Sequence, residues 1–162
     1  MKIIGIAGFK NSGKTTLIVD LIRELRSRSL RVATIKHAHH EFDIDHPGKD
    51  SYQHRKAGAA EVIVASDLRL AHVLELADSK PPELQELISR LSKPDVVLIE
   101  GYKCGSHPKL ELRRAEAPAP ELAADDSQVR AIIADYELTD AAVPVLSRDD
   151  VPGIVDFMLA CE

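Results

Sequence analysis

The sequence predicts an α/β fold in which helices cover a doubly wound, mostly parallel β-sheet, with an antiparallel hairpin as an extension. Short apolar runs typical of buried strands alternate along the chain with stretches whose apolar residues recur every three or four positions, as in amphipathic helices. A glycine-rich segment also joins the first such strand to the first such helix. We assign residues 1–162 to one domain, because this length suffices to bury a core.

The first strand and helix flank a phosphate-binding loop. Residues 2–7 are an apolar run that predicts a buried strand, and residues 8–15 match the pattern G-x-x-x-x-G-K-[ST]. A helix is expected next, because the following apolar residues fall on one helical stripe: Leu17, Ile18, Leu21, Ile22 and Leu25. Strand, glycine loop and helix in this order are typical of the P-loop NTPase fold.

The chemistry of the loop gives its residues their expected roles. Gly8 and Gly13 permit the sharp bends that point backbone N–H groups at phosphate oxygens, and the helix N-terminus adds partial positive charge. Lys14 should reach the β- and γ-phosphates, and the Thr15 hydroxyl should ligate Mg²⁺. The sequence therefore predicts a nucleoside triphosphate ligand. Its expected contacts in this segment are Gly8, Lys10, Asn11, Ser12, Gly13, Lys14, Thr15 and Thr16.

Further elements follow in the middle of the chain. Residues 31–36 predict a second strand, and residues 37–56, polar and without periodicity, predict a functional loop that leads into a short helix. Residues 61–65 and 68–74 flank a Ser-Asp turn and predict a hairpin at a sheet edge. Two prolines then open a helix whose apolar stripe is Leu84, Leu87, Ile88 and Leu91.

The second half of the chain continues the alternation. Residues 95–100 are the clearest buried strand, whereas residues 109–113 alternate charged and apolar side chains and predict an exposed strand. Residues 115–124, rich in alanine and proline, predict a surface loop. The remaining expected elements are two short strands at 129–134 and 143–146 and a helix from about 152 to 160.

The composition limits the classes of function. The net charge of −5 and the lack of a basic arm argue against nucleic acid as a ligand. No apolar run reaches membrane-spanning length, and the first run, interrupted at Lys10, is too short for a signal peptide. Cys104 and Cys161 fit reduced thiols better than a disulfide framework. We expect a cytoplasmic protein that binds neither nucleic acid nor membrane.

A carboxylate stands at the end of the clearest strand. Glu100, followed by glycine, fits a Walker B element, in which a carboxylate holds Mg²⁺ through water or orients the attacking water. Lys14 and Glu100 are therefore the candidate catalytic residues. Most such strands end in Asp, so the longer Glu side chain is a departure. The alternative is an ordinary strand-terminal Glu in solvent.

Residues 37–46 hold four histidines and three carboxylates. One interpretation is a switch loop in which Asp43 or Asp45 helps to place Mg²⁺, which makes Thr15, Glu100 and Asp45 the candidate metal ligands. A second is a transition-metal site, and a third is a solvated polar loop.

Base preference depends on the segment after the last predicted strand. Asp150 could accept two hydrogen bonds from guanine, while Arg148 would lie over the plane of the base. Asp149 and Asp150 could instead cap the last helix, where carboxylates favour the N-terminal dipole. The two roles are compatible.

The residues described above resemble the molybdopterin-guanine dinucleotide biosynthesis protein B (MobB) family. The resemblance spans nearly the whole chain in order, although residues 114–128 match nothing in it. Its blocks are residues 8–17, 36–45, 47–58, 97–103 and 145–150.

This resemblance implies a GTP-binding protein with weak Mg²⁺-dependent GTPase activity, usually a homodimer. It implies a helper role in attaching GMP to molybdopterin during molybdenum cofactor biosynthesis, with the molybdenum cofactor guanylyltransferase as partner. By position, it implies that residues 8–16 form the phosphate site, that Glu100 is the Walker B carboxylate, and that residues 43–56 face nucleotide or partner. A dimer has a separate rationale, because the strands at 68–74 and 109–113 would leave sheet edges for a second chain to cover.

Two other functions stay open. A P-loop small-molecule kinase would need an arginine-bearing lid, for which Arg113 and Arg114 are the candidates. A GTP-dependent metallochaperone would use the histidines of the 37–46 loop: His37, His39, His40 and His46.

Overall fold

The computed structural model describes residues 1–38, 42–76, 81–102 and 105–161. The chain divides into two compact units. The first comprises residues 1–37 and 84–162, and the second comprises residues 38–83.

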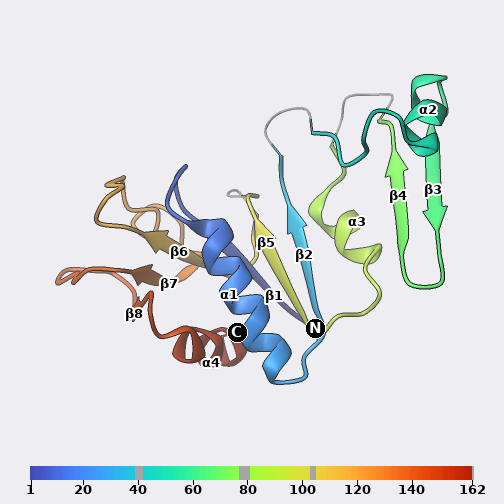
Figure 1. The fold of residues 1–162 in the computed structure, drawn as a ribbon. Helices are drawn as coiled ribbons and strands as arrows, with labels where there is room; N and C mark the ends of the chain where they lie inside the picture. The colour runs from blue at the N-terminus through green and yellow to red at the C-terminus, as the bar shows by residue number, and fades with distance from the viewer. Residues whose placement is uncertain (39–41, 77–80, 103–104, 162) are drawn as a thin grey trace. The chain divides into compact units, whose positions relative to one another are not determined.

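The first unit is built on a six-stranded parallel sheet (Figure 1). The strand order is β2-β5-β1-β6-β7-β8, and every neighbouring pair is parallel. All carboxyl ends therefore meet at one edge, where ligands of open α/β sheets bind. In chain order the strands are β1 Lys2–Ala7, β2 Val32–Lys36, β5 Val96–Glu100, β6 Lys109–Arg113, β7 Val129–Ala134 and β8 Val145–Ser147.

Helices cover both faces of this sheet, which confirms the doubly wound prediction. Helices α1 (Lys14–Ser27) and α4 (Val151–Ala160) pack on one face around a shared apolar core. The short helix α3 (Leu84–Ser89) packs on the other face, against Val97 and Ile99 of β5. The expected stripe of α1 supplies fully buried side chains at Leu17, Leu21 and Leu25.

The prediction of an exposed strand at 109–113 is wrong. Strand β6 lies inside the sheet between β1 and β7, and Lys109 and Glu111 are only 2% and 1% exposed. The Lys109 ammonium pairs with Asp126 at 3.0 Å, and the Glu111 carboxylate accepts hydrogen bonds from the backbone N–H groups of Leu122 and Ala123. Charged side chains tolerate burial when such partners satisfy them. This strand therefore leaves no sheet edge, so the part of the dimer argument that rested on it is lost, whereas the edge at residues 70–74 remains.

The second unit contains the expected short helix and hairpin. Helix α2 (Asp50–Lys56) precedes strands β3 (Glu61–Ala65) and β4 (Leu70–Leu74), which pair antiparallel as a separate two-stranded sheet. The guanidinium of Arg55 links segments of this unit through ion pairs. Its Nη1 lies 2.8 Å from the Asp43 carboxylate and its Nε lies 2.7 Å from the Glu75 carboxylate.

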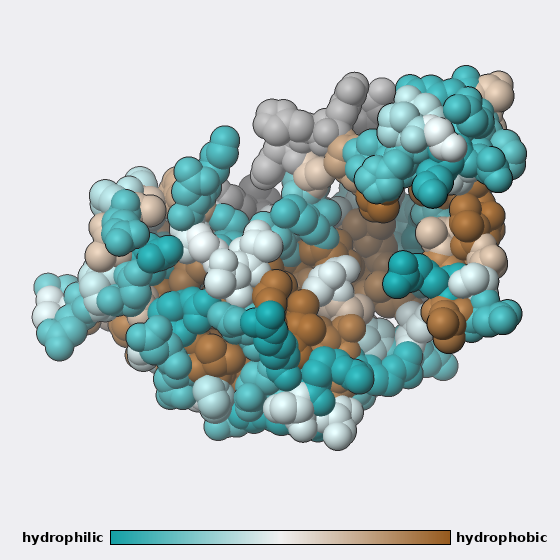
Figure 2. All heavy atoms as spheres, viewed as in Figure 1, coloured by the Kyte–Doolittle hydropathy of each residue, from teal (hydrophilic) through white to brown (hydrophobic). Residues whose placement is uncertain are grey.

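The hairpin exposes apolar side chains. Ile63 is 62% exposed, Leu68 98% and Leu70 67%, and Figure 2 shows brown apolar surface on this part of the molecule. Isolated two-stranded hairpins are marginal in water, so such a surface is typical of a contact region. Among the described residues, no helix has the length and apolar character needed to cross a membrane.

Candidate nucleotide-binding site

The glycine loop between β1 and α1 has the backbone that a phosphate site requires. Gly8 and Gly13 adopt φ of +147° and +85°, which side chains rarely permit. A Cβ at Gly8 would also lie 2.8 Å from the Leu112 carbonyl oxygen of β6 and 2.9 Å from Ser12 Oγ. The loop is thus packed tightly against the neighbouring strand, and only glycine fits at position 8.

The N-terminus of α1 is open toward the loop. Gly13 occupies the N-cap position in the left-handed conformation, no side chain caps it within the described chain, and the first turn carries no acidic residue. The first backbone N–H groups of a helix lack intrahelical partners and attract anions. This end of α1 is therefore suited to a phosphate group.

Lys14 bends back over the loop. Its ammonium donates to the Phe9 carbonyl oxygen at 2.6 Å and lies 3.5 Å from Ser12 Oγ. The ammonium is thus held within the loop, where it can exchange a carbonyl oxygen for a phosphate oxygen. The neighbouring expected contacts Lys10, Asn11, Thr15 and Thr16 are exposed, whereas Ser12 is buried.

Glu100 stands beside the phosphate loop. Strand β5 pairs with β1 so that Glu100 is in register with Ile6, two residues before Gly8. The side chain is 18% exposed, and its carboxylate lies 3.4 Å from the Lys36 ammonium. The side chain is therefore mostly buried and paired at the edge of the sheet where the phosphate loop lies, and the role of Glu100 as a Walker B carboxylate stays a prediction.

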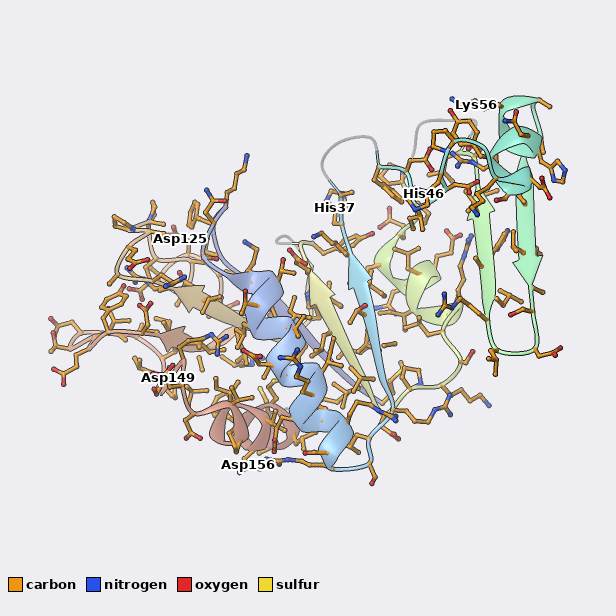
Figure 3. The ribbon with its side chains drawn as sticks, viewed as in Figure 1. His37, His46, Lys56, Asp125, Asp149 and Asp156 are labelled. Carbon is orange, nitrogen blue, oxygen red and sulfur yellow. The ribbon has the colours of Figure 1, made fainter. Side chains whose placement is uncertain are left out.

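His37 packs behind Glu100. Its backbone N–H donates to the Glu100 carbonyl oxygen at 2.9 Å, and its ring meets Tyr102 edge to face with centroids 5.0 Å apart. Gly101, at φ +96°, allows this approach because a Cβ there would lie 2.7 Å from His37 Cβ. His37 therefore has a packing role at the end of β2, where Figure 3 labels it.

The histidine-rich loop belongs mostly to the second unit. Asp45 accepts from Ser51 Oγ at 2.9 Å and lies 3.5 Å from an Arg55 nitrogen. His46, labelled in Figure 3, follows it, whereas His39, His40 and Cys104 lie outside the described residues. Among the residues that the structure describes, no three His, Cys, Asp or Glu side chains are grouped closely enough to hold a metal ion.

The polar residues that follow β8 make different contacts. Asp150 caps α4 by accepting from the Gly153 N–H at 3.0 Å, which confirms the capping role. Arg148 pairs with Asp20 of α1 at 2.7 Å. The expected contacts of Arg148 and Asp150 with a base stay predictions.

Sequence reasoning missed a contact between the loop and the end of β7. Arg114 packs against Gly13, where a Cβ would lie 3.7 Å from both its Cδ and Nη1. Its Nε is 3.0 Å from Asp135, the residue after β7. The Ala115 N–H, which also donates to Asp135, and the Arg114 guanidinium hold the pKa of that carboxyl below its usual range. Only the fold brings these residues together, so no local pattern could have shown them. Arg113, the other arginine considered for a lid, forms an ion pair with Glu121 at 2.9 Å.

Comparisons with known proteins agree on one family. The family model described as molybdopterin guanine dinucleotide synthesis protein B matches residues 3–135. The chain is similar to the molybdopterin-guanine dinucleotide biosynthesis adapter protein of Escherichia coli (strain K12), with 42% identity over 97% of this chain and 91% of the relative. The corresponding adapter protein of Haemophilus influenzae is 39% identical, over 96% and 86%.

Solved structures give the same result. The crystal structure of molybdopterin-guanine biosynthesis protein B superposes with a TM-score of 0.76 at 29% identity, covering 98% of this chain and 97% of that one. The crystal structure of Bacillus subtilis MobB also gives a TM-score of 0.76 at 28% identity, covering 99% and 97%.

Proposed function

The chain belongs to the molybdopterin guanine dinucleotide synthesis protein B family, and we propose that it serves this family's pathway as a GTP-binding adapter. Its role lies in molybdenum cofactor biosynthesis, as a protein that interacts with the machinery of that pathway. The proposed ligands are GTP and Mg²⁺.

The observation that carries the nucleotide proposal is the phosphate loop. Its two left-handed glycines, the open N-terminus of α1 and the Lys14 ammonium all lie at the carboxyl edge of the sheet. When a triphosphate enters, Lys14 exchanges the Phe9 carbonyl for β- and γ-phosphate oxygens. The loop's N–H groups then hold the phosphates.

The residues near the loop fit Mg²⁺. The Thr15 hydroxyl and the Glu100 carboxylate are oxygen donors, which Mg²⁺ prefers, and both belong to the first unit. Asp45 belongs to the second unit. To act as a metal ligand it would have to lose its hydrogen bond from Ser51 and its ion pair with Arg55. The ion would neutralise phosphate charge when bound, while Glu100 orients water beside it.

Hydrolysis should be slow. Arg114 contacts the loop at Gly13, but Asp135 and Glu116 hold its guanidinium. GTPases without an arginine finger turn over at roughly 10⁻⁴ to 10⁻³ per second. A slow rate suits an adapter whose nucleotide state changes its contacts.

We further propose that the protein is a cytoplasmic homodimer whose partner is the molybdenum cofactor guanylyltransferase. The exposed apolar side chains of the hairpin, Ile63, Leu68 and Leu70, support a protein contact in the second unit. A second chain covering this surface would offset the marginal stability of a two-stranded sheet.

Calorimetric titration tests the nucleotide proposal directly. The wild-type protein should bind a non-hydrolysable GTP analogue with Mg²⁺ more tightly than the ATP analogue. Lys14→Ala should abolish that binding, whereas Arg23→Ala, which removes an exposed cation of α1 outside the loop, should leave it nearly unchanged. If Lys14→Ala binds as tightly as the wild type, the phosphate site is elsewhere.

A further inference from the structure

A lysine outside the glycine-loop motif stands at the same edge of the sheet. Lys36 ends β2 and is in register with Glu100 at the end of β5, the strand between β2 and β1 (Figure 1). The His37 N–H, which donates to the Glu100 carbonyl oxygen at 2.9 Å, extends this pairing by one residue. The backbone of Lys36 is therefore fixed at the carboxyl edge, where the phosphate loop also lies.

The side chain of Lys36 is held much less firmly than its backbone. It is 63% exposed, and its ammonium lies 3.4 Å from the Glu100 carboxylate. Charge-assisted hydrogen bonds between such groups are about 2.7–2.9 Å long, and exposed ion pairs contribute little to stability. The ammonium can thus leave this carboxylate at small cost in free energy.

Three arginines near this edge are held more closely by their partners. Their nitrogens lie 2.7–3.0 Å from carboxylate oxygens, in the pairs Arg113–Glu121, Arg114–Asp135 and Arg148–Asp20. Each of these arginines is also less exposed than Lys36. Lys36 therefore gives up its partner for an incoming anion more readily than they do.

Lys36 and Glu100 lie on one side of the phosphate loop. In the strand order, β5 flanks β1 on the side away from β6, whereas Arg114, which follows β6, contacts the loop at Gly13. In nucleotide sites of this type the metal ion bridges the β- and γ-phosphates. Because Glu100 is the proposed carboxylate for that ion, the γ-phosphate belongs on the β5 side of the loop, beside Lys36.

We infer that Lys36 is a second cation of the phosphate site, which exchanges the Glu100 carboxylate for an oxygen of the γ-phosphate. The inference rests on the proposed function. A diphosphate places no phosphate group there, so this contact favours a triphosphate over a diphosphate. Until the γ-phosphate arrives, the ion pair keeps the charges of Lys36 and Glu100 compensated.

Calorimetric titrations with GDP and a non-hydrolysable GTP analogue, both with Mg²⁺, test this assignment. Lys36→Gln should weaken binding of the analogue roughly 10-fold or more, because it removes a charge-assisted hydrogen bond. The affinity for GDP should stay nearly unchanged, which also shows that the variant is folded. Lys36→Arg keeps the positive charge and should retain most of the preference for the analogue.

Two controls separate a contact with phosphate from other effects of the charge. Lys93→Gln removes an exposed lysine that precedes the amino end of β5, and it should change neither affinity. In a Glu100→Gln background, Lys36→Gln should still weaken binding of the analogue, because the contact does not act through the carboxylate.

The unfavourable outcomes are distinguishable. If the wild type binds both nucleotides and Lys36→Gln changes neither affinity, or lowers both equally, Lys36 does not contact the γ-phosphate and the inference alone is overturned. It is also overturned if the effect of Lys36→Gln disappears in the Glu100→Gln background, since Lys36 then only positions that carboxylate. If the wild type binds neither nucleotide, the proposed function fails and the inference fails with it.

Discussion

The two faces of the six-stranded sheet are held in different ways. One face packs against α1 and α4 mainly through apolar side chains, among them Leu21, Leu110 and Ile154. Above β6, the other face carries Lys109 and Glu111, and the loop 115–128 covers it through polar contacts. One strand is thus stabilised by hydrophobic burial on one side and by paired charges on the other.

This difference bears on the phosphate site because β6 supports the loop. The Leu112 carbonyl oxygen lies within 2.8 Å of where a Gly8 Cβ would be. The face that packs on α1 and α4 holds the larger of the two apolar clusters, and burial of apolar side chains is the dominant favourable contribution to folding. The polar face positions the loop 115–128. Hydrogen bonds and ion pairs require a particular geometry, whereas hydrophobic burial does not depend on direction.

The largest effect is expected on the apolar face. Leu21→Ala removes a fully buried side chain from the α1 stripe and should lower the free energy of unfolding by roughly 2–5 kcal/mol. Chemical denaturation measures this, with the exposed Val19→Ala on the same helix as control. A loss below about 1 kcal/mol would mean that the helix face is not the main source of stability.

A smaller effect is expected on the polar face. Glu111→Gln replaces the carboxylate that accepts from Leu122 and Ala123 and should cost roughly 1–3 kcal/mol. It should also increase hydrogen exchange in the loop 115–128, which Leu21→Ala should not do selectively. Glu116→Gln, an exposed residue of that loop, is the matched control. Equal exchange in the two variants would show that Glu111 does not hold the loop.

These two faces also explain what could be predicted from the sequence. The helix stripe of α1, the glycine loop and the cap at Asp150 depend on neighbours a few residues apart, so local patterns predicted them. Burial of Glu111 depends on backbone N–H groups of Leu122 and Ala123, which the pattern at 109–113 cannot reveal. For that reason an interior strand was predicted to be exposed.

The same limit applies to the site. The phosphate loop and the position of Glu100 follow from motif and strand order. The contact of Arg114 with Gly13 and Asp135 joins three separate segments of the chain. Such features become visible only when the fold brings the segments together.

The smallest effect concerns pH and the polar face. His107 is buried between Gly5 and Gly105, its ring nitrogens have no partner among the described residues, and burial, followed by the Lys109 charge, lowers its pKa. The unfolded state, in which His107 has its ordinary pKa, therefore binds a proton more readily than the folded state. The contribution of neutral, buried His107 to stability is fully present above about pH 6.5 and is lost as pH falls toward the lowered pKa.

Thermal unfolding between pH 7.5 and 5.5 measures this loss. The wild type should show a small decrease in Tm over the range, and His107→Gln should show a shallower one. Parallel curves for the two proteins would mean that His107 does not titrate with folding.

The most direct test of the account is hydrogen exchange with and without the Mg²⁺ complex of a non-hydrolysable GTP analogue. The account predicts slower exchange at residues 8–17, because the backbone N–H groups of the loop and the Lys14 ammonium hold the phosphates. Lys14→Ala should lose this protection. Unchanged exchange at residues 8–17 in the wild type would contradict the phosphate site itself.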